Sequence, residues 1–144
     1  MRVKYFELTD ETKVNHYGIT LHRIRLTSDC QWGKKGTLGG WVEIPTNIRG
    51  NAWVSGDAEV FGNAHVSGNS QVFGNSQVFG DAHVSGNSQV FGDARVSGNS
   101  WVYGNARVYG NSQVSGNSQV FGNSQVFGDA RVSGNSWVSG DAKV

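Results

Sequence analysis

A valine recurs at every sixth position from Val54 to Val144 without interruption, sixteen times in all. Ile48 and Val42 extend the same phase towards the N-terminus. Each six-residue unit reads Gly, then Asn or Asp, then Ala or Ser, a variable residue, Val, and finally Ser, Phe or Tyr. Self-similarity at a fixed period indicates a repeat architecture in which every unit adopts the same local structure. The period therefore predicts a solenoid over residues 42–144.

The order of residues within the unit predicts a short strand followed by a corner. Side chains of an extended segment alternate between its two faces, so Val and the Ala or Ser two residues before it point the same way. Gly followed by Asn or Asp tolerates positive φ and lets the chain turn. Three such corners close a triangular coil of about eighteen residues, with successive coils about 4.8 Å apart. We expect about six coils, in which stacking buries each valine and stabilises the fold by roughly 1.5–3 kcal/mol.

The motif Val-x-Gly-Asn-Ala-x resembles the hexapeptide repeat of the left-handed parallel β-helix superfamily, best known from trimeric acyltransferases. The resemblance covers residues 42–144 and implies an all-β, left-handed triangular solenoid. It implies little about function, because the matching residues are structural ones. The segment 35–43, Lys-Gly-Thr-Leu-Gly-Gly-Trp-Val-Glu, is similar to uncharacterised phage and prophage proteins that place a small β-rich cap before such repeats. Residues 1–41 are therefore expected to form an N-terminal β-rich cap.

Within the cap, Arg2–Leu8 and Ile19–Leu26 alternate in the manner of strands. Polar turns are expected at Thr9–Thr12 and Thr27–Asp29, and the glycine-rich stretch 33–40 is expected to be a loop that leads into the first coil. Such a cap would cover the unpaired backbone edge of the first coil, which otherwise recruits other strands.

Positions eighteen apart should stack, which sorts the aromatic residues into columns. Alternation places these rings on the outside of the coil, beside the variable position. We predict an interaction surface from them, because a contiguous apolar strip on a soluble protein usually has a partner. The alternative is that the stacked rings only hold coils together, as cross-strand aromatic pairs do. The predicted surface residues are Phe73, Phe91, Tyr109 and Phe127 on one face, and Trp101, Tyr103, Phe121 and Trp137 on another.

An acyltransferase-like enzyme is the alternative function, with His65 or His83 as the general base that the resembling family uses. Active members of that family usually interrupt their coils with a long loop that shapes the cleft, and these repeats contain no insertion. Segments 69–90 and 117–138 agree at 20 of 22 positions at an offset of 48, which is not a multiple of 18. The two copies thus present the same residues on different faces, which suits a scaffold better than an active site. We predict a protein that is not an enzyme.

No cofactor or metal is expected either, because two histidines without carboxylate or thiol neighbours make a weak metal site. The 12 basic and 11 acidic residues leave a net charge of +1, which argues against nucleic-acid and membrane partners. No apolar run approaches the ~18 residues of a membrane span, and the first residues lack the apolar core of a signal peptide. Cys30 is the single cysteine, so no internal disulfide forms and a cytoplasmic setting is expected.

The last coil ends at Val144 in mid-unit, and its open edge is expected to pair with a second copy. A tail-to-tail homodimer with twofold symmetry would satisfy both edges, and association through the aromatic face of Phe73, Phe91, Tyr109 and Phe127 is the rival mode. The overall prediction is a non-enzymatic β-solenoid that works through protein–protein contacts. We expect it to be phage- or prophage-encoded and to act in the host cytoplasm on a host protein, with inhibition of a host defence complex or another host complex as one role.

Overall fold

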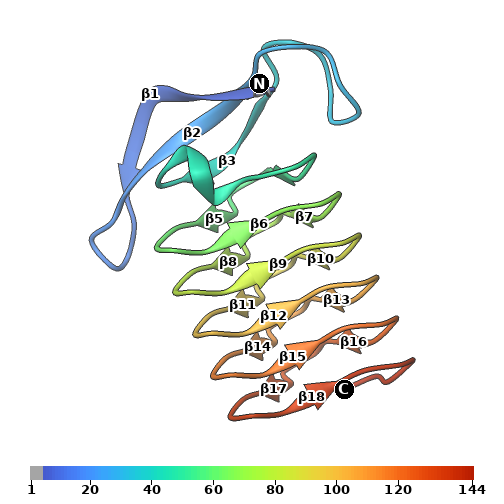
Figure 1. Cartoon of the computed structure of the whole chain (residues 1–144). Coiled ribbons are helices and arrows are strands. Elements are labelled where there is room, and N and C mark those ends of the chain that lie inside the picture. Colours follow the sequence, from blue (N-terminus) through green and yellow to red (C-terminus); the bar gives the residue numbers. More distant parts are fainter. Residues whose placement is uncertain (1–4) are drawn as a thin grey trace.

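The computed structural model describes residues 5–144, which form a β-solenoid with a hairpin folded over one end (Figure 1). The hairpin strands are β1 (Phe6–Val14) and β2 (Thr20–Leu26). They are followed by β3 (Leu38–Val42) and a single 3-10 turn, η1 (Pro45–Asn47). Every later element is a strand of two residues. Among residues 5–144, no helix is long and apolar enough to cross a membrane.

The short strands sort into three sheets, because each coil contributes one strand to each sheet. Strands pair in parallel with a register of eighteen residues, for example Gln71 with Gln89 and Val72 with Val90. Sheet one contains β4 (Trp53–Val54), β7 (Gln71–Val72), β10 (Gln89–Val90), β13 (Arg107–Val108) and β16 (Gln125–Val126). Sheet two continues from β3 into β5 (Glu59–Val60), β8 (Gln77–Val78), β11 (Arg95–Val96), β14 (Gln113–Val114) and β17 (Arg131–Val132). Sheet three contains β6 (His65–Val66), β9 (His83–Val84), β12 (Trp101–Val102), β15 (Gln119–Val120) and β18 (Trp137–Val138).

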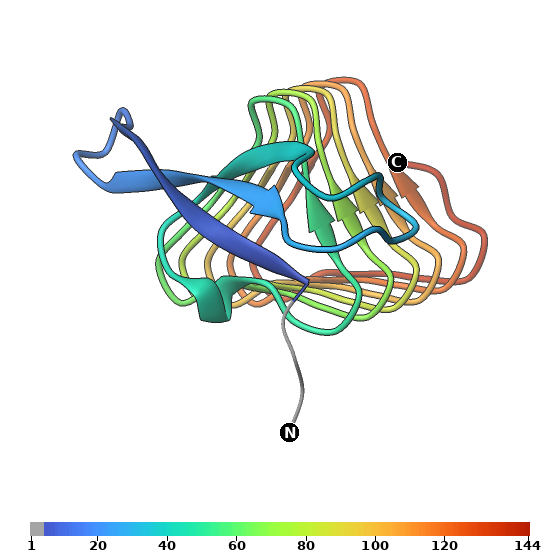
Figure 2. The same ribbon diagram turned by 90° about the horizontal axis from the view of Figure 1, so that it is seen from above.

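The strands from β4 to β18 make five coils, which corrects the expected number of about six. The difference arises because η1 occupies part of the segment between β3 and β4, and that segment contributes an isolated bridge from Ile48 to Val66 to sheet three instead of a strand. Seen from the N-terminal end in Figure 2, the chain runs counterclockwise as the coils recede, so the solenoid is left-handed. The triangular cross-section and the eighteen-residue coil agree with the sequence prediction.

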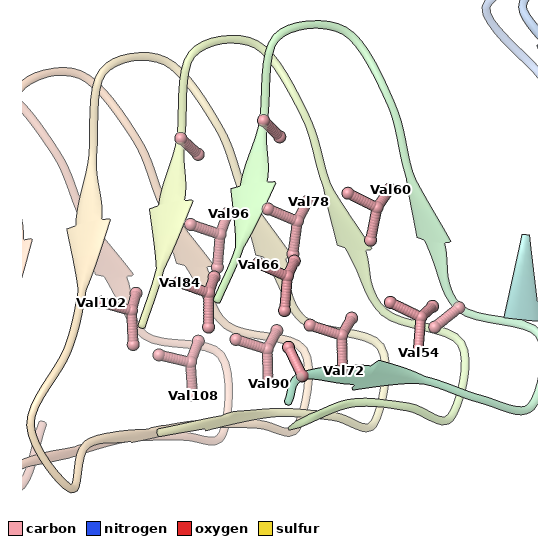
Figure 3. Close-up of a cluster of buried hydrophobic side chains, with 14 of the residues drawn as sticks. Val54, Val60, Val66, Val72, Val78, Val84, Val90, Val96, Val102 and Val108 are labelled. Atoms are coloured by element: carbon pink, nitrogen blue, oxygen red, sulfur yellow. The ribbon is translucent and has the colours of Figure 1, made fainter. Parts of the chain in front are cut away.

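The interior is a stack of valines, which point inward from all three sheets (Figure 3). Every repeat valine from Val54 to Val126 is fully buried, whereas Val144, which was expected to face inward, is 44% exposed. The small position of each unit from Ala52 to Ser124 is fully buried as well, and serine is as buried there as alanine. Ser76 shows why the two interchange, since its Oγ donates to the Phe73 carbonyl at 2.8 Å. A hydroxyl that is satisfied in this way adds little cost to the apolar interior.

Glycine turns each corner, and the stacking of coils leaves it no room for a side chain. At Gly86 φ is +69°, and a Cβ would lie 2.8 Å from the Gly104 carbonyl oxygen of the next coil. The asparagine after the glycine continues the ladder, since Asn87 N donates to that same carbonyl at 2.7 Å. Asparagine side chains also pair between coils, as in the 3.2 Å bond from Asn105 Nδ2 to Asn123 Oδ1.

The N-terminal hairpin covers the edge of sheet two. Strand β2 pairs antiparallel with β3, and β3 pairs in parallel with β5. One eight-stranded sheet therefore runs from the hairpin through the whole length of the solenoid. The backbone edge of the first coil is occupied on this sheet, as the sequence led us to expect of a cap.

The turn of the hairpin differs from the prediction. Thr9–Thr12 is not a turn, because β1 continues through it to Val14 with an irregularity in register. The chain reverses instead at Asn15–Gly18, where Asn15 Oδ1 accepts hydrogen bonds from the backbone nitrogens of Tyr17 at 2.9 Å and Ile19 at 3.0 Å. An asparagine that binds its following backbone in this way stabilises a turn. The predicted strand Arg2–Leu8 begins outside the described residues, and the expected loop 33–40 ends in strand β3.

Candidate interaction surface

The aromatic ladder on sheet one consists of Phe73, Phe91, Tyr109 and Phe127. Neighbouring rings are nearly parallel, and their centroids lie 4.9 Å, 4.9 Å and 5.5 Å apart along the column. Phe127 is 37% exposed, and the other three rings are half-buried. Because each ring covers the face of its neighbour, the ladder presents mainly ring edges to the outside. This geometry matches the role of holding adjacent coils together.

The tryptophan patch on sheet three consists of Trp101, Tyr103, Phe121 and Trp137. Tyr103 and Phe121 stack at 4.9 Å, and a tryptophan packs edge-on against each of them at 6.4 Å and 6.0 Å. Trp101 is 45% exposed and Trp137 is 67% exposed. The four side chains thus form one contiguous aromatic surface across strands β12, β15 and β18.

A third aromatic pair, on sheet two, is covered by the hairpin. Phe61 and Phe79 stack at 5.0 Å, but Phe61 is only 5% exposed. Tyr17, in the hairpin turn, lies 5.7 Å from the Phe61 ring and 5.4 Å from the Phe79 ring. Leu21 and Trp41 complete this small cluster outside the solenoid interior. The pair therefore fastens the cap and is not part of an open surface.

Glu59 also fastens the cap, and sequence reasoning missed this role. Its carboxylate lies 3.0 Å from Lys13 Nζ and accepts a hydrogen bond from Asn15 Nδ2 at 3.3 Å. The residue is 8% exposed, which is unusual for a glutamate on the outer face of a coil. Its position offered a clue, because Glu59 is the sole acidic residue at the variable position of the repeats.

His65 and His83 stack in one column on sheet three, with ring centroids 5.2 Å apart. Arg49 Nη2 lies 3.0 Å from His65 Nε2. Since arginine can only donate, this nitrogen of His65 acts as the acceptor and the ring is neutral. Burial, the Arg49 guanidinium and the neighbouring His83 lower the pKa of His65 below its ordinary value. His83 stacks on Trp101 at 4.6 Å, and its buried Nδ1 has no hydrogen-bond partner among the described residues.

The described residues contain no cluster of metal-ligating side chains. Among residues 5–144, no three His, Cys, Asp or Glu side chains come together in a group that could hold a metal ion. Cys30 is half-buried in the loop before β3 and carries a free thiol.

The family model described as the YdcK beta solenoid repeat matches the chain over residues 88–104, 102–116 and 124–140. All three stretches lie within the coils, between the residue that precedes strand β10 and the corner that follows strand β18. The match and the structure both indicate that the chain is a β-helix repeat protein. None of the curated proteins matches the chain.

Proposed function

We propose that this chain is a non-enzymatic scaffold that binds another protein through the tryptophan patch. The observation that carries the proposal is the exposure of Trp101 and Trp137, at 45% and 67%, within one contiguous aromatic cluster on a flat sheet. Tryptophan and tyrosine are enriched among the residues that dominate binding energy at interfaces. Exposed aromatic surface of this kind is costly to keep in water unless a partner covers it.

The coils themselves do not require tryptophan at these positions. Gln119 lies between the two tryptophans in the same column and pairs in register with both. The internal duplication makes the same point, since Gln89 stands in the first copy where Trp137 stands in the second. An amide therefore satisfies the fold at this position, and the tryptophans are better explained by binding.

The acyltransferase alternative finds less support. The Nε2 atom of His65 is engaged by Arg49, so it is not free to accept a proton from a substrate. Within residues 50–144, every six-residue unit returns to its sheet, and no loop leaves the coils to enclose a cleft. Both features favour the scaffold role.

The partner that we propose is a host protein, encountered in the host cytoplasm by a phage- or prophage-encoded chain. This part rests on the similarity of residues 35–43 to phage proteins with a comparable cap. Self-association into a dimer, through the last coil or through the aromatic ladder on sheet one, is a separate proposal that light scattering at micromolar concentration tests. A strict monomer would eliminate it.

The binding proposal is tested by capture from a bacterial lysate with the immobilised chain, followed by mass spectrometry. The key variant is the double substitution Trp101→Gln with Trp137→Gln, which uses the residue already present at Gln119. Arg131→Gln on sheet two is the matched control, because it changes an exposed variable position on another face. We expect one or more proteins that the wild type and the control retain and the double variant loses, with unchanged circular dichroism. Recovery of the same proteins by all three chains would refute the role of the patch.

A further inference from the structure

Sheet three differs from the other two faces of the solenoid, because its outward strand positions carry no Lys, Arg, Asp or Glu. Arg107 faces outward on sheet one, and Arg95 and Arg131 do so on sheet two. On sheet three, the corresponding positions from β6 to β18 hold histidine, serine, glutamine and aromatic residues. Removing a charged side chain from water is unfavourable unless the charge is well paired. Sheet three is therefore the face that another protein surface can cover with the smallest loss of charge hydration.

The charged residues around this face lie at its ends and its rim. Arg49 lies at the N-terminal end, where its backbone nitrogen donates to the Val66 carbonyl at 2.8 Å, and its side chain is exposed. Asp141 lies at the opposite end, at the corner after β18, and is exposed as well. Asp81 lies at the corner before β9. Within residues 5–144, neither Arg49 nor Asp141 forms an ion pair, so each is available to a charge on another molecule.

These charges favour one arrangement of two copies. A twofold axis in an interface pairs the same surface of both molecules. If the axis runs along the solenoid, the two Arg49 residues lie at one end and the two Asp141 residues at the other, so like charges oppose. If the axis runs across the solenoid, the coils of the two copies stack in opposite directions, and each Arg49 lies toward the Asp141 of the other copy. The same reversal brings the exposed Trp137 toward the Arg49 of the other copy, where a guanidinium can pack on the indole face.

We propose that two copies of this chain pair face to face through sheet three, with their coils in opposite directions, and that this contact covers the tryptophan patch. The role of the pairing rests on the proposed function. Because the patch cannot meet two surfaces at once, a partner protein has to displace the second copy. Self-pairing thus keeps the tryptophans covered when no partner is bound.

The size of the face indicates a weak and reversible contact. Five coils stacked ~4.8 Å apart give a height of roughly 24 Å, and the six residues of one side of a coil span at most ~20 Å. The flat area of the face is therefore at most about 480 Å² per copy. A stable interface of standard size buries about 800 Å² of accessible surface on each partner. Projecting side chains raise the accessible area above the flat area, so the contact lies near the small, transient end of protein interfaces.

Sedimentation velocity of the full chain from about 2 to about 200 µM tests the pairing. The key variant is Trp101→Gln with Trp137→Gln, and Arg131→Gln is again its control. The arrangement is tested by Arg49→Glu and Asp141→Lys, each alone and both combined. Arg131→Glu is the matched control, because it reverses an exposed charge on sheet two. Circular dichroism establishes that each variant is folded.

We expect the wild type and both Arg131 variants to change from monomer to dimer over this range. The double tryptophan variant should need at least about a tenfold higher concentration. Each single charge reversal should weaken the pairing about threefold or more. The combined variant should restore it, because its two charges have exchanged places.

Two results would overturn pairing through this face: a wild type that stays monomeric, or a double tryptophan variant that pairs as the wild type does. A combined variant that pairs no better than the single ones would overturn the reversed arrangement. The capture experiment separates this inference from the proposed function. A protein captured through the tryptophans by a chain that stays monomeric would support the proposed function and refute self-pairing. A tryptophan-dependent dimer without any tryptophan-dependent captured protein would do the reverse.

Discussion

Alanine substitutions at Gly116 and Gly134 separate two reasons for glycine at the corners. Both residues have positive φ, +70° and +69°, so each substitution places a Cβ in the left-handed region at a cost of about 1–2 kcal/mol. The two positions differ in the space around them. A Cβ at Gly116 would lie 2.8 Å from both the backbone nitrogen and the backbone oxygen of Gly134, whereas a Cβ at Gly134 meets nothing within 4 Å.

The clash at Gly116 involves backbone, which cannot rotate away as a side chain does. The two coils must separate locally, beside the 2.7 Å hydrogen bond from Asn117 N to the Gly134 carbonyl. Overpacking of this kind costs about 1–3 kcal/mol. We therefore expect Gly116→Ala to lower the free energy of unfolding by about 2–5 kcal/mol and Gly134→Ala by about 1–2 kcal/mol.

Urea unfolding, followed by tryptophan fluorescence and far-ultraviolet circular dichroism, measures both losses under the same conditions. Native-like spectra of the variants in the absence of urea establish that both remain folded. Equal losses from the two variants, or a larger loss at Gly134, would refute the idea that contact between coils excludes a side chain at these corners.

Three further substitutions test the interior, the histidine column and the cap. Val96→Ala should lower the free energy of unfolding by about 2 kcal/mol, because the side chain is fully buried, whereas Val144→Ala should change it by less than ~0.5 kcal/mol in the same urea titration. The lowered pKa of His65 means that the unfolded chain binds its proton more tightly, so stability should fall as the pH drops below the ordinary value of 6.5. The fall between pH 7 and pH 5 should be smaller for His65→Gln, and identical pH profiles would contradict this. Glu59→Gln removes the charge that holds Lys13, so amide hydrogen exchange should accelerate in the hairpin but not in the coils; uniform acceleration would count against a local role.

The solenoid could be predicted from the repeat, because the residues of each six-residue unit determine the conformation of that unit. Gly sets a corner through its positive φ, Val sets the inward face, and the period of six then brings Val72 opposite Val90. The aromatic columns follow from the same arithmetic, so the stacking of Phe73 on Phe91 is predictable from their separation of one coil. Because the same local pattern recurs in every unit, it can be recognised from the sequence alone.

The exposure of each aromatic column was decided by tertiary structure. Phe61 and Phe121 occupy equivalent positions in their units, yet the hairpin buries Phe61, whereas Phe121 is half-buried and the neighbouring Trp137 is exposed. The placement of the hairpin depends on contacts between residues far apart in the sequence, such as Lys13 with Glu59. Its turn also lies at Asn15 and not at Thr9–Thr12, because Thr12 pairs with His22 across the hairpin and the Thr9 hydroxyl donates to the Arg23 carbonyl at 2.8 Å. Such contacts have no period, so they become visible only when the chain has folded.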